Sequence, residues 1–176
     1  QGHKKEEWIR KREADLLPCS YYHVVFTLPQ ELNGLAISQP QLIYKTLFEA
    51  AWATLNQFGK TEGLQLGMIG VLHTWGQNLS LHPHLHCIVP GGGLTMQGKW
   101  RKKVRTDKFL FPVKALSKVY RAKFVALLRT SGVKDSNLMD KLFSKNWVVY
   151  AKRPFGGPKQ VIEYLGRYTH SPRWIF

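Results

Sequence analysis

The chain contains little cysteine and nothing that looks like a paired-cysteine zinc site. Only two of its 176 residues are cysteines, Cys19 and Cys87, and neither has a second cysteine at CxxC spacing. Neither builds a zinc site by itself, because such sites draw on closely spaced pairs of ligands. We expect both thiols to be reduced and to pack as small apolar side chains.

Acidic residues are also scarce. The sequence has 11 Asp and Glu against 26 Lys and Arg, so its formal net charge is +15. A field of this sign favours a polyanionic partner, with nucleic acid as the commonest one and an anionic membrane surface as the competitor. The excess of positive charge therefore predicts a nucleic-acid-binding protein.

Long apolar runs are missing as well. No stretch approaches the ~18 consecutive apolar residues that a membrane-spanning helix needs, and residues 1–17 have no apolar signal-peptide core. We therefore expect no membrane partner and a cytoplasmic protein of a bacterial cell, associated with the nucleoid when it acts.

Apolar content and chain length predict one folded domain over 1–176, because 44% of the residues are apolar and the length suits a single core. Residues 1–17 predict a short charged helix or linker. Strands are predicted at 21–28, 66–75, 84–89 and 147–151, helices at 39–58, 113–131 and from Pro158 onward, and one short helical turn within 136–145. The glycines at 91–93 suggest a flexible break. This order predicts an α+β fold, a central antiparallel sheet with helices packed on it.

The motif HPHLH at 82–86 is the first candidate site. His84 and His86 are two apart in a predicted strand, so both imidazoles point to one face and can bind one metal ion. If strands 66–75 and 84–89 form a hairpin in which Gln77 faces His84, then Trp75 faces His86 and His73 shares their face. Gln77, His73 and His82 are therefore all candidate third ligands, and a bulge would change their ranking.

A pair of tyrosines is the second candidate site. Tyr164 and Tyr168 are four apart in a predicted helix and so share one helical face. A phenol is a weak nucleophile at neutral pH, since its ordinary pKa is about 10. A metal ion that stabilises the phenolate and polarises a phosphate would let one tyrosine attack a phosphodiester. The first attack would hold a 5′ phosphate and release a 3′ hydroxyl, the second tyrosine could attack another strand, and no ATP would be needed.

Basic residues interleaved with aromatics suit single-stranded DNA, because cations follow the phosphates and rings stack on bases. The predicted DNA-contacting residues are Trp100, Arg101, Lys102, Lys103, Arg105, Lys152, Arg153, Lys159 and Arg167. Binding through such residues should weaken steeply with salt.

Taken together, these motifs resemble those of HUH-type rolling-circle transposases with a tyrosine pair, the insertion sequence ninety-one group. The resemblance rests on YYHVVFTLPQELN (21–33), LHTWGQNLSLHPHLHCIVPGGG (72–93) and GPKQVIEYLGRYTH (157–170), which occur in the expected order. His84 and His86 correspond to the HUH motif of that family, and Tyr164 and Tyr168 to its YxxxY motif.

The resemblance implies Mg²⁺ or Mn²⁺, cleavage of single-stranded DNA at transposon ends, and the sheet that replication initiators and relaxases share. In related enzymes a third polar residue completes the metal site, which makes Gln77 the preferred ligand over His73 and His82. Such transposases usually carry an N-terminal cysteine-rich zinc module and continue beyond the tyrosine helix. We therefore expect this chain to be a fragment of a longer transposase.

Three alternatives stay open at this point. A plasmid relaxase or replication initiator of the same HUH type would share both motifs. A non-catalytic nucleic-acid-binding domain would use the histidines only for packing and would form no covalent product with DNA. A metal hydrolase would need no tyrosines and should place carboxylates near 82–86, where the sequence has none.

Overall fold

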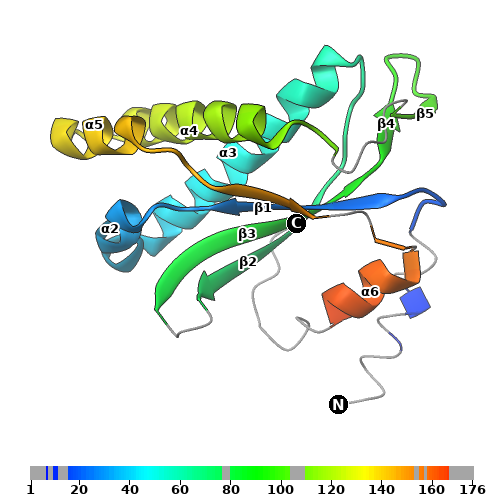
Figure 1. Ribbon diagram of the computed structural model, residues 1–176, viewed down its shortest axis with the longest axis horizontal. Coiled ribbons are helices and arrows are strands. Elements are labelled where there is room, and N and C mark those ends of the chain that lie inside the picture. The colour runs from blue at the N-terminus through cyan, green and yellow to red at the C-terminus, as the bar shows by residue number, and fades with distance from the viewer. Residues whose placement is uncertain are drawn as a thin grey trace.

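A four-stranded antiparallel sheet with the strand order β2-β3-β1-β6 organises the protein (Figure 1). Its strands are β1 (Tyr21–Thr27), β2 (Ile69–Trp75), β3 (Leu81–Pro90) and β6 (Val149–Lys152). The computed structural model describes residues 7, 10–11, 16–76, 80–103, 110–152, 155–156 and 158–166. The predicted α+β class and the predicted hairpin of the second and third strands are both confirmed.

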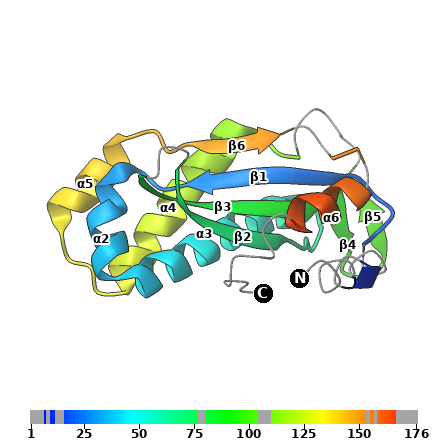
Figure 2. The ribbon, with the colours of Figure 1, turned by 90° about the horizontal axis from the view of Figure 1, so that it is seen from below.

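Helices cover the two faces of the sheet unequally. Helices α3 (Pro40–Thr61) and α4 (Val113–Thr130) pack on one face, and the shorter α6 (Pro158–Gly166) lies on the other (Figures 1 and 2). Every second strand residue points to the α3/α4 face and enters the main core. These buried strand residues are Tyr22, Val24, Phe26, Leu85, Cys87, Val89 and Val149.

Local sequence explains where the two large helices begin and end. Pro40 occupies the first turn of α3, where its missing N–H costs nothing, and Gly63 with φ +66° follows the last turn. Helix α4 follows Pro112 and buries a stripe at four-residue spacing. That stripe consists of Leu116, Tyr120, Phe124 and Leu128.

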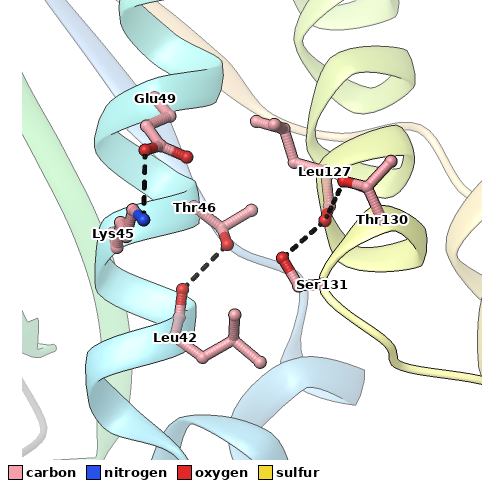
Figure 3. A network of polar contacts seen from close by, with 7 residues as sticks. All are labelled: Leu42, Lys45, Thr46, Glu49, Leu127, Thr130 and Ser131. Atoms are coloured by element: carbon pink, nitrogen blue, oxygen red, sulfur yellow. Dashed lines mark hydrogen bonds and ion pairs between the residues drawn. The ribbon is translucent and has the colours of Figure 1, made fainter.

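Hydroxyl groups on α3 and α4 bond back to their own helices (Figure 3). Thr46 Oγ1 donates to the Leu42 carbonyl at 2.8 Å, and Thr130 and Ser131 both donate to the Leu127 carbonyl, at 2.9 and 2.8 Å. The Leu127 carbonyl also accepts from the Ser131 amide at 3.0 Å, so the two hydroxyls add to a bond that ends the helix. The bond from Thr46, which is 2% exposed, satisfies a hydroxyl buried beside the core.

A small second sheet replaces the flexible break that the glycines at 91–93 suggested, so that expectation is wrong. Strand β4 (Gly92–Leu94) pairs with β5 (Trp100–Lys102). A Cβ atom on Gly92 would lie 2.5 Å from the Arg101 carbonyl oxygen, and one on Gly93 would lie 2.4 Å from that of Gln65. Glycine is therefore required here by close backbone approach rather than by flexibility.

The other predicted elements agree with the structure except at the edges. The segment at 136–145 is α5 (Ser136–Ser144), whose N-cap Asp135 accepts from the Leu138 amide at 2.9 Å. The short helices η1 (Gln30–Leu32) and α2 (Asn33–Ser38) were not predicted from the sequence. Of residues 1–17, only 7, 10, 11, 16 and 17 are described.

Among the described helices, none combines the length and hydropathy that crossing a membrane requires.

The alternation along β3 makes a stability prediction. Leu85 is fully buried in the main core between two histidines that point the other way. Leu85→Ala should lower the free energy of unfolding by about 2–5 kcal/mol, because it leaves a cavity. Urea denaturation measures this change. Ile37→Ala, at a side chain that is 73% exposed, is the control and should change the free energy by less than about 0.5 kcal/mol. Equal effects of both changes would contradict the assigned alternation.

Candidate metal and tyrosine site

Three histidines meet on the β2–β3 hairpin. His73 is the direct pairing partner of His84, and Val71 is that of His86. The ring centroid of His73 lies 5.2 Å from that of His84 and 4.2 Å from that of His86. One potential ligand atom from each residue lies within 4.8 Å of the others. The expected shared face of His84 and His86 is confirmed, and His73 joins them there.

The hairpin has a different offset from the one used to rank the candidate ligands. In that offset Gln77 would face His84 and Trp75 would face His86, whereas His73 and Val71 hold those positions, and a bulge separates His73 from Trp75. Turn length sets the offset of a hairpin and could not be read from the sequence. Gln77 itself lies outside the described residues, so its role as a ligand stays a prediction.

His82 lies beside the cluster and contributes a backbone contact. Its side chain is exposed, its ring centroid lies 5.4 Å from that of His84, and its carbonyl oxygen lies 2.6 Å from His84 Nδ1. Its role as a ligand stays a prediction. Because a carbonyl can only accept, His84 Nδ1 carries the proton and donates. The unprotonated nitrogen of His84 is then Nε2, which is the state that a metal ligand requires.

Burial keeps the three imidazoles uncharged. Loss of hydration, with a smaller contribution from neighbouring histidines, lowers the pKa of His73 to about 4 and that of His86 to about 2. The pKa of His84 is also lowered by burial. At neutral pH the cluster therefore offers neutral nitrogen donors, as imidazole ligands of a metal must be. The donor set fits a divalent cation.

Tyr164 reaches this cluster from α6. Its phenolic oxygen lies 2.7 Å from His86 Nδ1 and 3.2 Å from His23 Nε2. A second apolar cluster of Tyr21, Val71, Ile88 and Val161 fastens α6 to the histidine face of the sheet, with Phe155 and Tyr164 packed against it. The helix thus places a phenol directly beside a candidate metal ligand, as the sequence motifs predicted.

His23 belongs to the site but was not singled out from the sequence. It lies on β1, is only 2% exposed, and has its Nε2 atom 2.8 Å from His86 Nδ1. Burial, with Lys152 and His73 nearby, lowers its pKa to about 4. The available signal was a single imidazole in the middle of the largely apolar YYHVVFT strand.

The remaining predicted residues are placed as follows. Lys152 is exposed on β6 and pairs with His23, so it lies beside the site. Trp100, Arg101 and Lys102 are exposed on β5. Lys103 is largely occupied by an ion pair with Glu62 at 3.0 Å and by the Phe111 ring 3.9 Å away. Arg105, Arg153, Arg167 and Tyr168 lie outside the described residues, as does the Lys159 side chain.

The lowered pKa values predict how stability depends on pH. Below pH 6.5 the unfolded chain protonates His23, His73 and His86 while the folded chain does not, so the unfolded state binds more protons. The free energy of unfolding should therefore fall as the pH drops from about 6.5 to about 4, by up to about 1.4 kcal/mol per pH unit for each histidine. Urea titrations across this range measure the slope. His23→Phe should flatten it, and an unchanged slope in that variant would contradict the assigned burial.

Comparison with known proteins identifies the family. Residues 67–173 match the family described as "Putative transposase", and residues 1–28 match the "Transposase zinc-binding domain". That second stretch contains a single cysteine, Cys19.

Two curated proteins and one group of solved structures are similar. The chain is 38% identical over 190 aligned positions to "Putative transposase y4qJ" of Sinorhizobium fredii, covering 97% of this chain and 48% of that protein. It is 30% identical to the transposase for insertion sequence element IS801 of Pseudomonas savastanoi pv. phaseolicola, covering 95% and 43%. The conjugative relaxase TrwC in complex with a 27-mer DNA matches with a TM-score of 0.47 and 19% identity over 62% of this chain and 44% of that one.

The chain therefore spans about half the length of the curated relatives it matches. The family match covers well over half of the 176 residues and includes the histidine motif and both tyrosines. The resemblance seen in the sequence is confirmed, and the chain belongs to the transposase family of the insertion sequence ninety-one type.

Proposed function

We propose that this chain is the HUH nuclease and strand-transferase domain of a longer transposase. It would nick and rejoin single-stranded DNA at transposon ends through a 5′-phosphotyrosine intermediate, within a bacterial cell. The observation that carries the proposal is the contact between a candidate nucleophile and a candidate metal ligand: the Tyr164 oxygen lies 2.7 Å from His86 Nδ1.

His73, His84 and His86 would hold the divalent ion. When bound, that ion would polarise the scissile phosphate and neutralise charge on it. Three imidazoles suit Mn²⁺ better than Mg²⁺, which favours oxygen ligands and would need water and phosphate oxygens to complete its shell. Gln77 stays a candidate for a further ligand.

The chain's own residues perform the transfer. The Tyr164 hydroxyl gives up its proton as its oxygen attacks phosphorus, an O–P bond forms to tyrosine, and the bond from phosphorus to the 3′ oxygen breaks. The departing 3′ oxygen takes up one proton and becomes a hydroxyl, so that one proton is lost and one is gained. Because one phosphate ester replaces another, the reverse attack by a 3′ hydroxyl reseals a strand without ATP. Tyr168 would supply the second attack.

Exposed basic and aromatic residues, one of them beside the site, would guide the DNA. Lys152 lies beside His23 on the edge strand, and Trp100, Arg101 and Lys102 form an exposed strip on β5. A ring that can stack on bases next to cations that follow phosphates is the arrangement found in single-strand binding surfaces. Family membership favours a transposon end over a plasmid origin as the substrate.

Covalent capture tests the reaction. We expect end-labelled single-stranded DNA from a transposon end to form an adduct that survives SDS when Mn²⁺ is present. Tyr164→Phe should reduce the adduct at least tenfold or shift it to Tyr168, since the phenol is the nucleophile. Tyr44→Phe, on α3 across the sheet, removes a phenol far from the site and should leave the adduct unchanged. DNA binding by all variants with no adduct in any would favour the non-catalytic alternative.

Salt dependence tests the DNA contacts. Lys102→Ala combined with Lys152→Ala should weaken binding of single-stranded DNA and reduce the slope of log K against log salt by about 1.4, since each lost phosphate contact removes about 0.7. Fluorescence anisotropy at several salt concentrations measures the slope. Lys114→Ala with Lys118→Ala, exposed on α4 at the opposite face, is the charge-matched control. An equal change in both pairs would show that only net charge matters.

A further inference from the structure

We propose that His23 is a positioning residue that couples the nucleophile to the metal ligand set. In this role, which rests on the proposed function, His23 Nε2 presents its single lone pair to the Tyr164 hydroxyl and to His86 Nδ1, and these two donors share it. The side chain would fix both the direction of the phenol and the tautomer of His86, without touching DNA or metal itself.

The strand register places His23 for this task. On β1, His23 pairs with Ile88 and Val25 pairs with His86, so His23 and His86 are diagonal neighbours on the same face. His23 is 2% exposed. A buried imidazole at this point needs hydrogen-bonding partners, and the two within reach belong to the candidate reaction site.

Three atoms form a closed triangle. The distances are 2.8 Å between His23 Nε2 and His86 Nδ1, 3.2 Å between His23 Nε2 and the Tyr164 oxygen, and 2.7 Å between that oxygen and His86 Nδ1. A triangle with three protons would bring two donors against each other. Two protons fit, one on the phenol and one on a histidine nitrogen. If His86 binds a metal through Nε2, the second proton lies on His86 Nδ1, and His23 Nε2 is then the acceptor.

That assignment has a consequence for His86. With its proton on Nδ1, its unprotonated nitrogen is Nε2, the nitrogen on the other side of the ring from Tyr164 and His23. Metal-binding histidines generally have their second nitrogen bonded to an outer partner that fixes the tautomer. His23 would serve His86 as the His82 carbonyl serves His84.

Packing holds the His23 ring still. Its centroid lies 5.0 Å from the His86 ring and 5.8 Å from the Phe155 ring, both stacked, and 4.8 Å from the Tyr164 ring in an edge contact. The Phe155 amide donates to the Tyr21 carbonyl at 2.9 Å, which ties the segment before α6 to β1. A ring clamped on two sides can orient its partners more closely than a mobile one.

Two substitutions separate hydrogen bonding from packing. His23→Phe keeps an aromatic ring and removes the acceptor, whereas His23→Gln places an amide oxygen near the position of Nε2. We expect His23→Phe to weaken Mn²⁺ binding, measured by calorimetry without DNA, and the single-turnover rate of adduct formation by 10–100-fold each. His23→Gln should restore a large part of both. Thr54→Val, which removes a buried hydroxyl on α3, controls for lost stability alone and should leave Mn²⁺ affinity unchanged.

The outcomes separate this proposal from the proposed function. If wild-type protein forms no adduct, the proposed function fails and His23 is judged on Mn²⁺ affinity alone. Equal Mn²⁺ affinities for wild type and His23→Phe would overturn the positioning role, as would equal losses in the Phe and Gln variants. Weaker Mn²⁺ binding in His23→Phe with recovery in His23→Gln would support it.

Discussion

The antiparallel pairing of β3 with its two neighbours is the constraint on which the rest of the structure depends. Because strand side chains alternate, this pairing sends Leu85 and Cys87 into the core beneath α3 and α4 and sends His84 and His86 to the opposite face. A slip of one residue would exchange the two sets. The burial of Leu85 therefore holds the histidines in register. The pairing register of β3 specifies the core and the site together.

The site combines uncharged donors with a strongly positive protein. Burial keeps His73, His84 and His86 neutral, so a divalent ion would enter without meeting charge from its own ligands. The net charge of +15 lies elsewhere, on exposed residues such as Lys102 and Lys152 that can approach phosphates. In the proposed function, attraction of DNA and activation of the phosphate fall to different residues, and Tyr164 on α6 would be the nucleophile.

Periodicity predicted much of this arrangement. The two-residue spacing of His84 and His86 and the helical setting of Tyr164 required only local geometry. Contacts between distant strands were not predictable in the same way. Which β2 residue faces His84 depends on the turn and on a bulge, so His73 was ranked below Gln77. His23 meets His86 only through the pairing of β1 with β3, 63 residues apart in sequence, and no local pattern reports such a contact.

Anomalous diffraction from crystals grown with Mn²⁺ and single-stranded DNA tests the central claim most directly. The account predicts one strong manganese peak among the ring nitrogens of His73, His84 and His86, with the Tyr164 oxygen facing a phosphate bound to that ion. A manganese peak away from these histidines, or a phosphate bound out of reach of Tyr164, would contradict it.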